Sequence, residues 1–242
     1  MSTPELPNEV VKRDLHFFLL VDCSGSMSGA KIASLNHAVA ESLPAIRDAV
    51  QGHPEVCVKF RAIKFSNNAS WHIGSLTSAD PINNVYWNDL TASGQTETNK
   101  AISILLDALD VEMMPRRGFP PVCLLLSDGF CTNPDGYYDA IEKLNNLPWG
   151  KKAVRLAIAV GDESEYDEQE LMRFVNVKDE NGNPVFLKAH NSQELVHYIK
   201  WASVAASIGA SVSKSKSTGD SGQNVILPSP TAAPISSQSD VF

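Results

Sequence analysis

One stretch decides the fold: Leu15-His16-Phe17-Phe18-Leu19-Leu20-Val21-Asp22-Cys23-Ser24-Gly25-Ser26. Its first seven residues are apolar almost throughout, which is typical of a strand buried on both faces of a parallel sheet. The D-x-S-x-S run that follows places carboxylate and hydroxyl oxygens at the end of that strand. The stretch therefore predicts a central strand that delivers polar side chains to one edge of a sheet.

Apolar strands and helical periods alternate beyond this stretch. Further strands are expected at residues 56–65, 69–73, 121–126, 153–160 and 185–188, and helices at residues 31–50, 98–109, 137–147, 168–175 and 193–208. Asn67-Asn68 predicts a turn, so the strand at 69–73 should run antiparallel to the one before it. The alternation predicts an α/β fold: a doubly wound, mostly parallel, Rossmann-like sheet flanked by helices, with one antiparallel edge strand.

The composition predicts one domain with two polar ends. We expect an N-terminal extension at residues 1–13, a domain at 14–209, and a disordered Ser/Pro-rich tail at 210–242 that buries too little apolar surface to fold. No apolar run reaches the roughly 20 residues of a membrane span, and no signal peptide is visible, so a cytoplasmic protein with reduced cysteines is expected. A formal charge of −8 argues against nucleic-acid binding.

Five oxygen-bearing side chains follow predicted strand ends or lie in nearby loops. They are Asp22, Ser24, Ser26, Thr96 in Gly94-Gln95-Thr96, and Asp128 in Ser127-Asp128-Gly129. In a doubly wound sheet the binding crevice lies at the carboxyl ends of the strands, so these side chains should converge. Small hard cations prefer oxygen ligands, and magnesium takes six. The expected ion is therefore Mg²⁺, with Mn²⁺ and Ca²⁺ as alternatives. Thiolate ligation by Cys23 and Cys131 is the less favoured reading, because hard oxygen donors dominate the site.

The full set resembles the metal-ion-dependent adhesion site (MIDAS) of von Willebrand factor A (VWA) domains, over about residues 14 to 208. Cys23 stands where that family often has Thr, which alters no ligand. The resemblance implies a non-enzymatic interaction module whose cation is held by mostly neutral ligands. Such a cation accepts a further anionic oxygen, which the family takes from an Asp or Glu of a protein partner.

A narrower resemblance concerns the sequence from Leu19 to Ile32, which is similar to bacterial TerY-like proteins. Those proteins are associated with tellurium resistance and stress response, and are often encoded beside a protein kinase and a PP2C-type phosphatase. The resemblance implies a cytosolic scaffold in such a system. The negative charge and the lack of a long apolar run add the expectation that neither nucleic acid nor membrane is a partner.

Three further residues are expected to contact the partner. Trp87 precedes the Thr96 loop and could serve as an aromatic anchor, the alternative being a packing role at the core edge. Gly94 and Gly129 belong to the G-x-T and S-D-G motifs. An acidic run from Asp162 to Glu170 should lie on the same face, either as a solvated loop and first helical turn or as a rim that attracts cations.

Three other functions would use some of the same residues. A haloacid-dehalogenase-like, Mg-dependent phosphatase also places an Asp after its first strand, but it needs a second carboxylate two residues later, where this chain has Ser24. A serine hydrolase would need a Gly-x-Ser-x-Gly elbow, which is absent. A third alternative stays within the VWA family: a regulator of an AAA+ ATPase, with ATP hydrolysis supplied by another chain.

Overall fold

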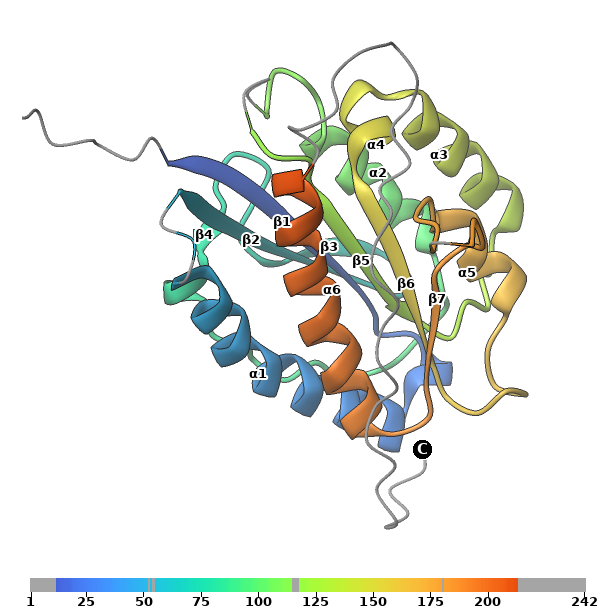
Figure 1. The fold of residues 1–242 in the computed structure, drawn as a ribbon. Helices are drawn as coiled ribbons and strands as arrows, with labels where there is room; N and C mark the ends of the chain where they lie inside the picture. Colours follow the sequence, from blue (N-terminus) through green and yellow to red (C-terminus); the bar gives the residue numbers. More distant parts are fainter. Residues whose placement is uncertain (1–11, 52, 54, 115–117, 180, 213–242) are drawn as a thin grey trace, which may run out of the picture.

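A computed structural model describes residues 12–51, 53, 55–114, 118–179 and 181–212 of the chain. Seven strands form one sheet in the order β3-β2-β1-β5-β6-β7, and β4 also pairs with β2 (Figure 1). The strands are β1 (Arg13–Asp22), β2 (Val56–Phe65), β3 (Ala69–Ile73), β4 (Asp80–Pro81), β5 (Val122–Ser127), β6 (Val154–Val160) and β7 (Phe186–Ala189). β3 and β4 run antiparallel to β2, and the other neighbouring strands are parallel. The predicted fold class is confirmed.

Helices cover both faces of the sheet. They are α1 (Ala30–Gln51), α2 (Thr98–Ala108), α3 (Pro134–Asn146), α4 (Pro148–Lys152), α5 (Glu168–Phe174) and α6 (Ser192–Val212). α3 begins at Pro134, three residues before the predicted start, because Pro fits the first helical turn and Asn133 caps it by accepting from the Gly136 amide at 3.1 Å. Of the predicted extension and the predicted disordered tail, residues 1–11 and 213–242 lie outside the described residues.

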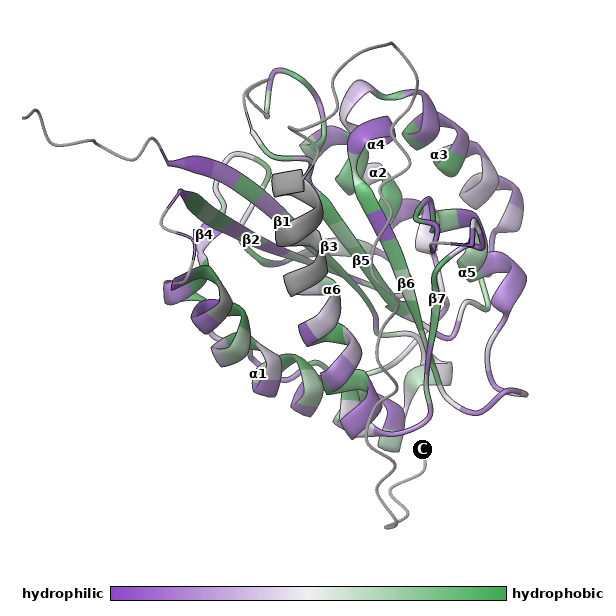
Figure 2. Cartoon of the chain, in the orientation of Figure 1, coloured by the Kyte–Doolittle hydropathy of each residue, from purple (hydrophilic) through white to green (hydrophobic). Residues whose placement is uncertain are grey.

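The core has two layers, one on each side of the sheet. Alternate side chains of β1 enter different layers: Phe17 and Leu19 pack with α1 and α6, whereas Phe18 and Leu20 pack with α2 and α3. Burial on both faces explains why the central strands are mostly apolar. Figure 2 shows the same pattern: the strands are mostly hydrophobic (green), and hydrophilic residues (purple) lie on the helices that flank them. Among the described helices, none combines the length and apolarity needed to cross a lipid bilayer.

A buried histidine–arginine pair interrupts this apolar pattern. His16 on β1 is buried, and its Nδ1 lies 3.0 Å from Nη1 of Arg61 on β2. Arg61 also donates from Nε to the Ser75 carbonyl at 2.9 Å. Burial, and secondarily the Arg61 charge, lowers the pKa of His16 to about 4. His16 is therefore neutral at pH 7 and accepts a hydrogen bond from Arg61.

The turn after β5 fixes the position of Asp128. Gly129 has a φ of 80°, a left-handed conformation that strains other residues. A Cβ atom there would lie 2.7 Å from both the Asp167 carbonyl oxygen and Leu171 Cγ. The Asp167 amide in turn donates to the Asp128 carbonyl at 2.7 Å. Close packing of this turn against α5 therefore requires glycine.

The His16–Arg61 pair predicts acid sensitivity. Because the pKa of His16 is lowered in the folded state, the unfolded chain binds the extra proton, and stability falls as the pH drops from about 6.5 towards 4. His16→Gln keeps an acceptor and removes the titration. Denaturant titrations at pH 7 and pH 4.5 should show the wild type losing about 2 kcal/mol more than the variant. Equal losses in the two proteins would contradict this account.

The Gly129 turn predicts that a side chain at this position destabilises the protein more than one at another glycine with positive φ. Gly129→Ala should destabilise the protein by about 2–3 kcal/mol, because strain at positive φ adds to the steric clash with Asp167 and Leu171. Gly182→Ala is the matched control: its φ is 85°, but no atom lies within 4 Å of the added Cβ, so only about 1 kcal/mol is expected. Chemical denaturation measures both, and equal values would show that the turn tolerates a side chain.

Candidate metal site

Backbone hydrogen bonds gather the three motif loops at the carboxyl ends of the central strands. The Gly25 amide donates to the Gly94 carbonyl at 2.8 Å, and the Ser93 amide donates to the Cys23 carbonyl at 2.8 Å. The Thr132 amide donates to the Thr96 carbonyl at 3.0 Å. The G-x-T loop is therefore bonded to the D-x-S-x-S loop on one side and to the loop after Asp128 on the other.

Asp22 is fully buried, and both of its carboxylate oxygens accept hydrogen bonds. Oδ1 accepts from the Ser24 amide at 2.8 Å, and Oδ2 accepts from the Ser127 hydroxyl at 2.5 Å. Burial raises the pKa of Asp22 to about 6, and the neighbouring Asp128 carboxylate adds to the shift. Asp22 thus supplies negative charge and fixes the loops, with no oxygen free of a protein donor.

Asp128 is also fully buried, but it is differently bonded. Its Oδ1 accepts from the Phe130 amide at 3.4 Å, whereas Oδ2 has no hydrogen-bond partner among the described residues. The nearest cation is the Lys31 ammonium, 4.0 Å from Oδ2. Burial raises the pKa of Asp128, while a hydrogen bond from Ser26 and the charge of Lys31 oppose that change. A buried carboxylate oxygen without a donor is rare and suits a metal ion or a water bound to it.

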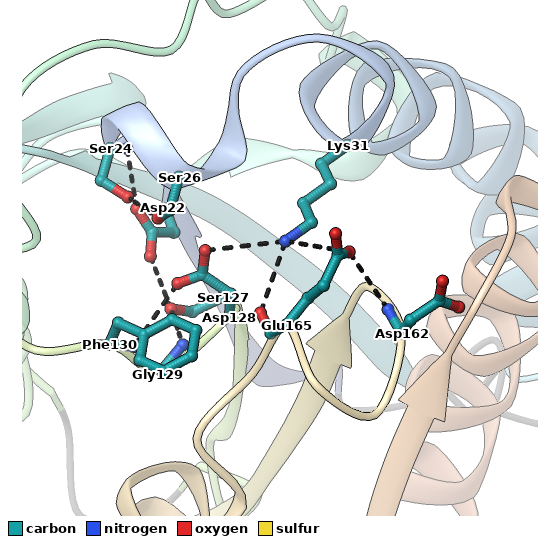
Figure 3. Close-up of polar contacts among 10 residues, drawn as sticks. All are labelled: Asp22, Ser24, Ser26, Lys31, Ser127, Asp128, Gly129, Phe130, Asp162 and Glu165. Atoms are coloured by element: carbon teal, nitrogen blue, oxygen red, sulfur yellow. Dashed lines mark hydrogen bonds and ion pairs between the residues drawn. The ribbon is translucent and has the colours of Figure 1, made fainter. Parts of the chain in front are cut away.

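Hydroxyl groups line the site beside these carboxylates. The Ser24 and Ser26 Oγ atoms lie 3.0 Å apart (Figure 3). Ser24 is buried, whereas Ser26 is exposed, so this pair of hydroxyls reaches from the interior to solvent. Thr96, in the neighbouring loop, is also buried. The Thr96 backbone is held by its amide, which donates to the Thr132 hydroxyl at 3.0 Å.

The donor set fits a small hard cation. Two carboxylates and short hydroxyl side chains are oxygen ligands of the kind that Mg²⁺ and Mn²⁺ accept. In the described part of the chain, no three His, Cys, Asp or Glu side chains come together to hold a metal. Burial raises the pKa of the Cys23 thiol to about 12, and its Sγ donates to the Val21 carbonyl at 3.7 Å.

The three residues expected to contact a partner lie in different environments. Gly94 is exposed at the rim, whereas Gly129 is buried. Trp87 is half-buried: its indole Nε1 donates to Asn36 Oδ1 at 3.0 Å, and its ring meets His72 edge-on at 4.6 Å between centroids. This packing ties Trp87 to α1, and a contact with a partner stays a prediction for all three residues.

Lys31, Ser127 and Glu165 belong to the site, although the motif analysis did not select them. Ser127 precedes Asp128 in the S-D-G motif, and its position at the end of a buried strand was a usable signal. Lys31 lies in the first turn of α1, where the helix dipole disfavours a cation. This unfavourable position was a second usable signal. Glu165, from the acidic run, lies 3.4 Å from the Lys31 ammonium, so this run does reach the site.

Comparisons with known proteins agree with the fold. The chain aligns with a von Willebrand factor type A protein from Catenulispora acidiphila at 13% identity and a TM-score of 0.60, covering 80% of this chain and 43% of that one. The ArnB paralog VWA2 from Sulfolobus acidocaldarius aligns at 19% identity and a TM-score of 0.51, covering 75% and 43%. No curated protein matches the sequence.

A third solved structure holds a metal in its own MIDAS motif. Proximal thread matrix protein 1 from the mussel byssus, with a zinc-occupied MIDAS motif, aligns at 16% identity and a TM-score of 0.51, covering 83% of this chain and 46% of that one. The chain thus spans less than half the length of each of these structures. The family model of the von Willebrand factor type A domain matches residues 17–199. The chain therefore belongs to the von Willebrand factor type A domain family.

Proposed function

We propose that this domain binds a divalent cation at Asp22, Ser24, Ser26, Thr96 and Asp128, and that the cation accepts a carboxylate from a protein partner. VWA domains are in general metal-dependent interaction modules rather than enzymes. The observation that carries the proposal is Asp128 Oδ2, a buried carboxylate oxygen without a hydrogen bond, beside two hydroxyls that lie 3.0 Å apart. That arrangement is costly by itself and is relieved by a cation.

The residues take different roles in this proposal. The hydroxyls of Ser24, Ser26 and Thr96 ligate the ion directly. Asp128 offers Oδ2 to the ion or to a water bound to it, and Asp22 orients the loops because both its oxygens already accept hydrogen bonds. The bound ion would supply positive charge towards the exposed side of Ser26, where a partner's Asp or Glu enters.

The identity of the ion and of the partners is part of the proposal. Hydroxyl-rich, six-coordinate sites favour Mg²⁺, with Mn²⁺ and Ca²⁺ as alternatives. The similarity of residues 19–32 to TerY-like proteins supports a cytoplasmic scaffold for a protein kinase and a PP2C-type phosphatase in a tellurium-resistance or stress system. Regulation of an AAA+ ATPase is the alternative within the same family.

The chemistry at the site speaks against a haloacid-dehalogenase-like phosphatase. Such an enzyme needs a carboxylate two residues after the first aspartate to transfer a proton. That position is Ser24, which is buried with its amide bonded to Asp22. A serine hydroxyl is too weak an acid to take the place of a carboxylic acid in that step.

Metal binding should stabilise the protein through Asp128. At a magnesium concentration about 100 times the dissociation constant, the free energy of unfolding should rise by about 2.7 kcal/mol. Asp128→Ala should abolish both this rise and the heat of calorimetric titration. Asp139→Asn, which removes a charge from the exposed face of α3, is the control and should bind as the wild type does. A wild type whose stability and calorimetric heat ignore Mg²⁺, Mn²⁺ and Ca²⁺ alike would refute the proposed site.

Partner capture should depend on the ion. In pull-downs from the native host, proteins retained in Mg²⁺ should be released by EDTA and absent with Asp128→Ala, while circular dichroism in EDTA still shows a folded domain. Mass spectrometry of the released proteins distinguishes a kinase and phosphatase pair from an ATPase ring. Capture that survives EDTA unchanged would count against a carboxylate bound through metal.

A further inference from the structure

A buried lysine lies between the metal site and the acidic loop. The Lys31 ammonium lies 4.0 Å from Asp128 Oδ2, 3.4 Å from Glu165 Oε2 and 3.4 Å from the Glu165 carbonyl oxygen. Only 11% of its side chain is exposed. Figure 3 shows Asp22, Ser24 and Ser26 on one side of Asp128 and Lys31 on the other, aimed at the same carboxylate.

The surrounding backbone is shaped to admit this side chain. Gly161, directly after β6, has a φ of 126°, and a Cβ atom there would lie 2.9 Å from Lys31 Cε and 3.0 Å from both Lys31 Nζ and Glu165 Oε2. A side chain at residue 161 would be strained at this φ and would displace the ends of Lys31 and Glu165 from one another. Lys31 also lies in the first turn of α1, where the helix dipole opposes a cation. Its placement is held by the two carboxylates rather than by the helix.

The charges around the site can be counted. Asp22, Asp128 and Glu165 contribute three negative charges, and Lys31 contributes one positive charge. With Lys31 the group carries a net charge of −2, which one divalent ion neutralises; without Lys31 it would carry −3. The ammonium thus compensates part of the charge that a metal ion would compensate, beside Asp128 Oδ2, which accepts no hydrogen bond from the described residues.

We propose that Lys31 is a tethered cation that substitutes for part of the metal's charge: it stabilises the metal-free site and weakens divalent-ion binding. This proposal rests on the metal site proposed above. The physical reason is that like charges repel at short range while Asp128 is attracted to both cations. Lys31 is accordingly a positioning residue for Asp128 that sets the metal affinity, with Glu165 holding it in place.

The proposal predicts effects of opposite sign from one substitution. Lys31→Met keeps the apolar stem and removes the charge. In EDTA the variant should be less stable than the wild type, because Asp128 and Glu165 lose their shared cation. In calorimetric titration it should bind Mg²⁺ about tenfold more tightly at low salt, and the difference should shrink in 1 M salt. If Lys31 had a purely structural role, Lys31→Met would be less stable than the wild type but would bind Mg²⁺ no more tightly.

Two more variants separate the contributions. Glu165→Gln leaves the lysine with one carboxylate, so Mg²⁺ binding should weaken in the wild-type background and change less in the Lys31→Met background. Lys200→Met is the matched control. The Lys200 Nζ on α6 lies 3.9 Å from Oε1 of Glu41 on α1, and removing this charge should leave the metal affinity unchanged.

The outcomes distinguish this inference from the proposed function. Failure of the wild type to bind any divalent ion would overturn the metal site. If the wild type binds the ion and Lys31→Met binds it equally well or more weakly, the metal site stands but the proposed role of Lys31 is wrong. A stability in EDTA that Lys31→Met and Lys200→Met reduce equally would also overturn it.

Discussion

The hydrogen bond between Asp22 and Ser127 is the constraint on which the rest of the site depends. It joins the ends of the two central strands, β1 and β5, through residues 105 positions apart in the chain. A carboxylate buried this completely is tolerated because both of its oxygens have donors. The neighbouring Asp128 carboxylate still raises the cost of ionising Asp22. A pair of acids at the end of an apolar sheet therefore creates a demand for positive charge.

Two cations can meet that demand. One is the divalent ion proposed for the cage formed by Asp22, Ser24, Ser26, Thr96 and Asp128. The other is the Lys31 ammonium, which reaches Asp128 from α1. Both would act on Asp128 Oδ2, so the strength of each would depend on the other. The fold brings the groups together: strand ends deliver the acids, backbone hydrogen bonds join the G-x-T loop to the D-x-S-x-S loop, and a glycine after β6 lies against the lysine.

The sequence allowed the fold to be predicted, and five metal ligands to be proposed, because their signals are local. Apolar strands ending in D-x-S-x-S and S-D-G fix which edge of the sheet receives the oxygens. The contacts of Lys31 were not predictable, because Glu165 lies 134 positions away and reaches it only through the bend at Gly161. The two-residue strand β4 and the short helix α4 carry too few residues for a periodic pattern. Trp87 illustrates a different difficulty, since its hydrogen bond to Asn36 depends on tertiary packing across 51 positions.

Helix α6 covers the same face of the sheet as α1 and runs antiparallel to the strands (Figure 1). It starts at Ser192, just after the carboxyl end of β7, and its 21 residues carry the chain about 30 Å towards the opposite edge of the sheet. The cage and the last turn of α6 therefore lie at opposite poles of the domain. Tethering the protein to a sensor surface from the α6 pole would leave the cage facing the solution, which is the orientation that measurements of ligand capture require.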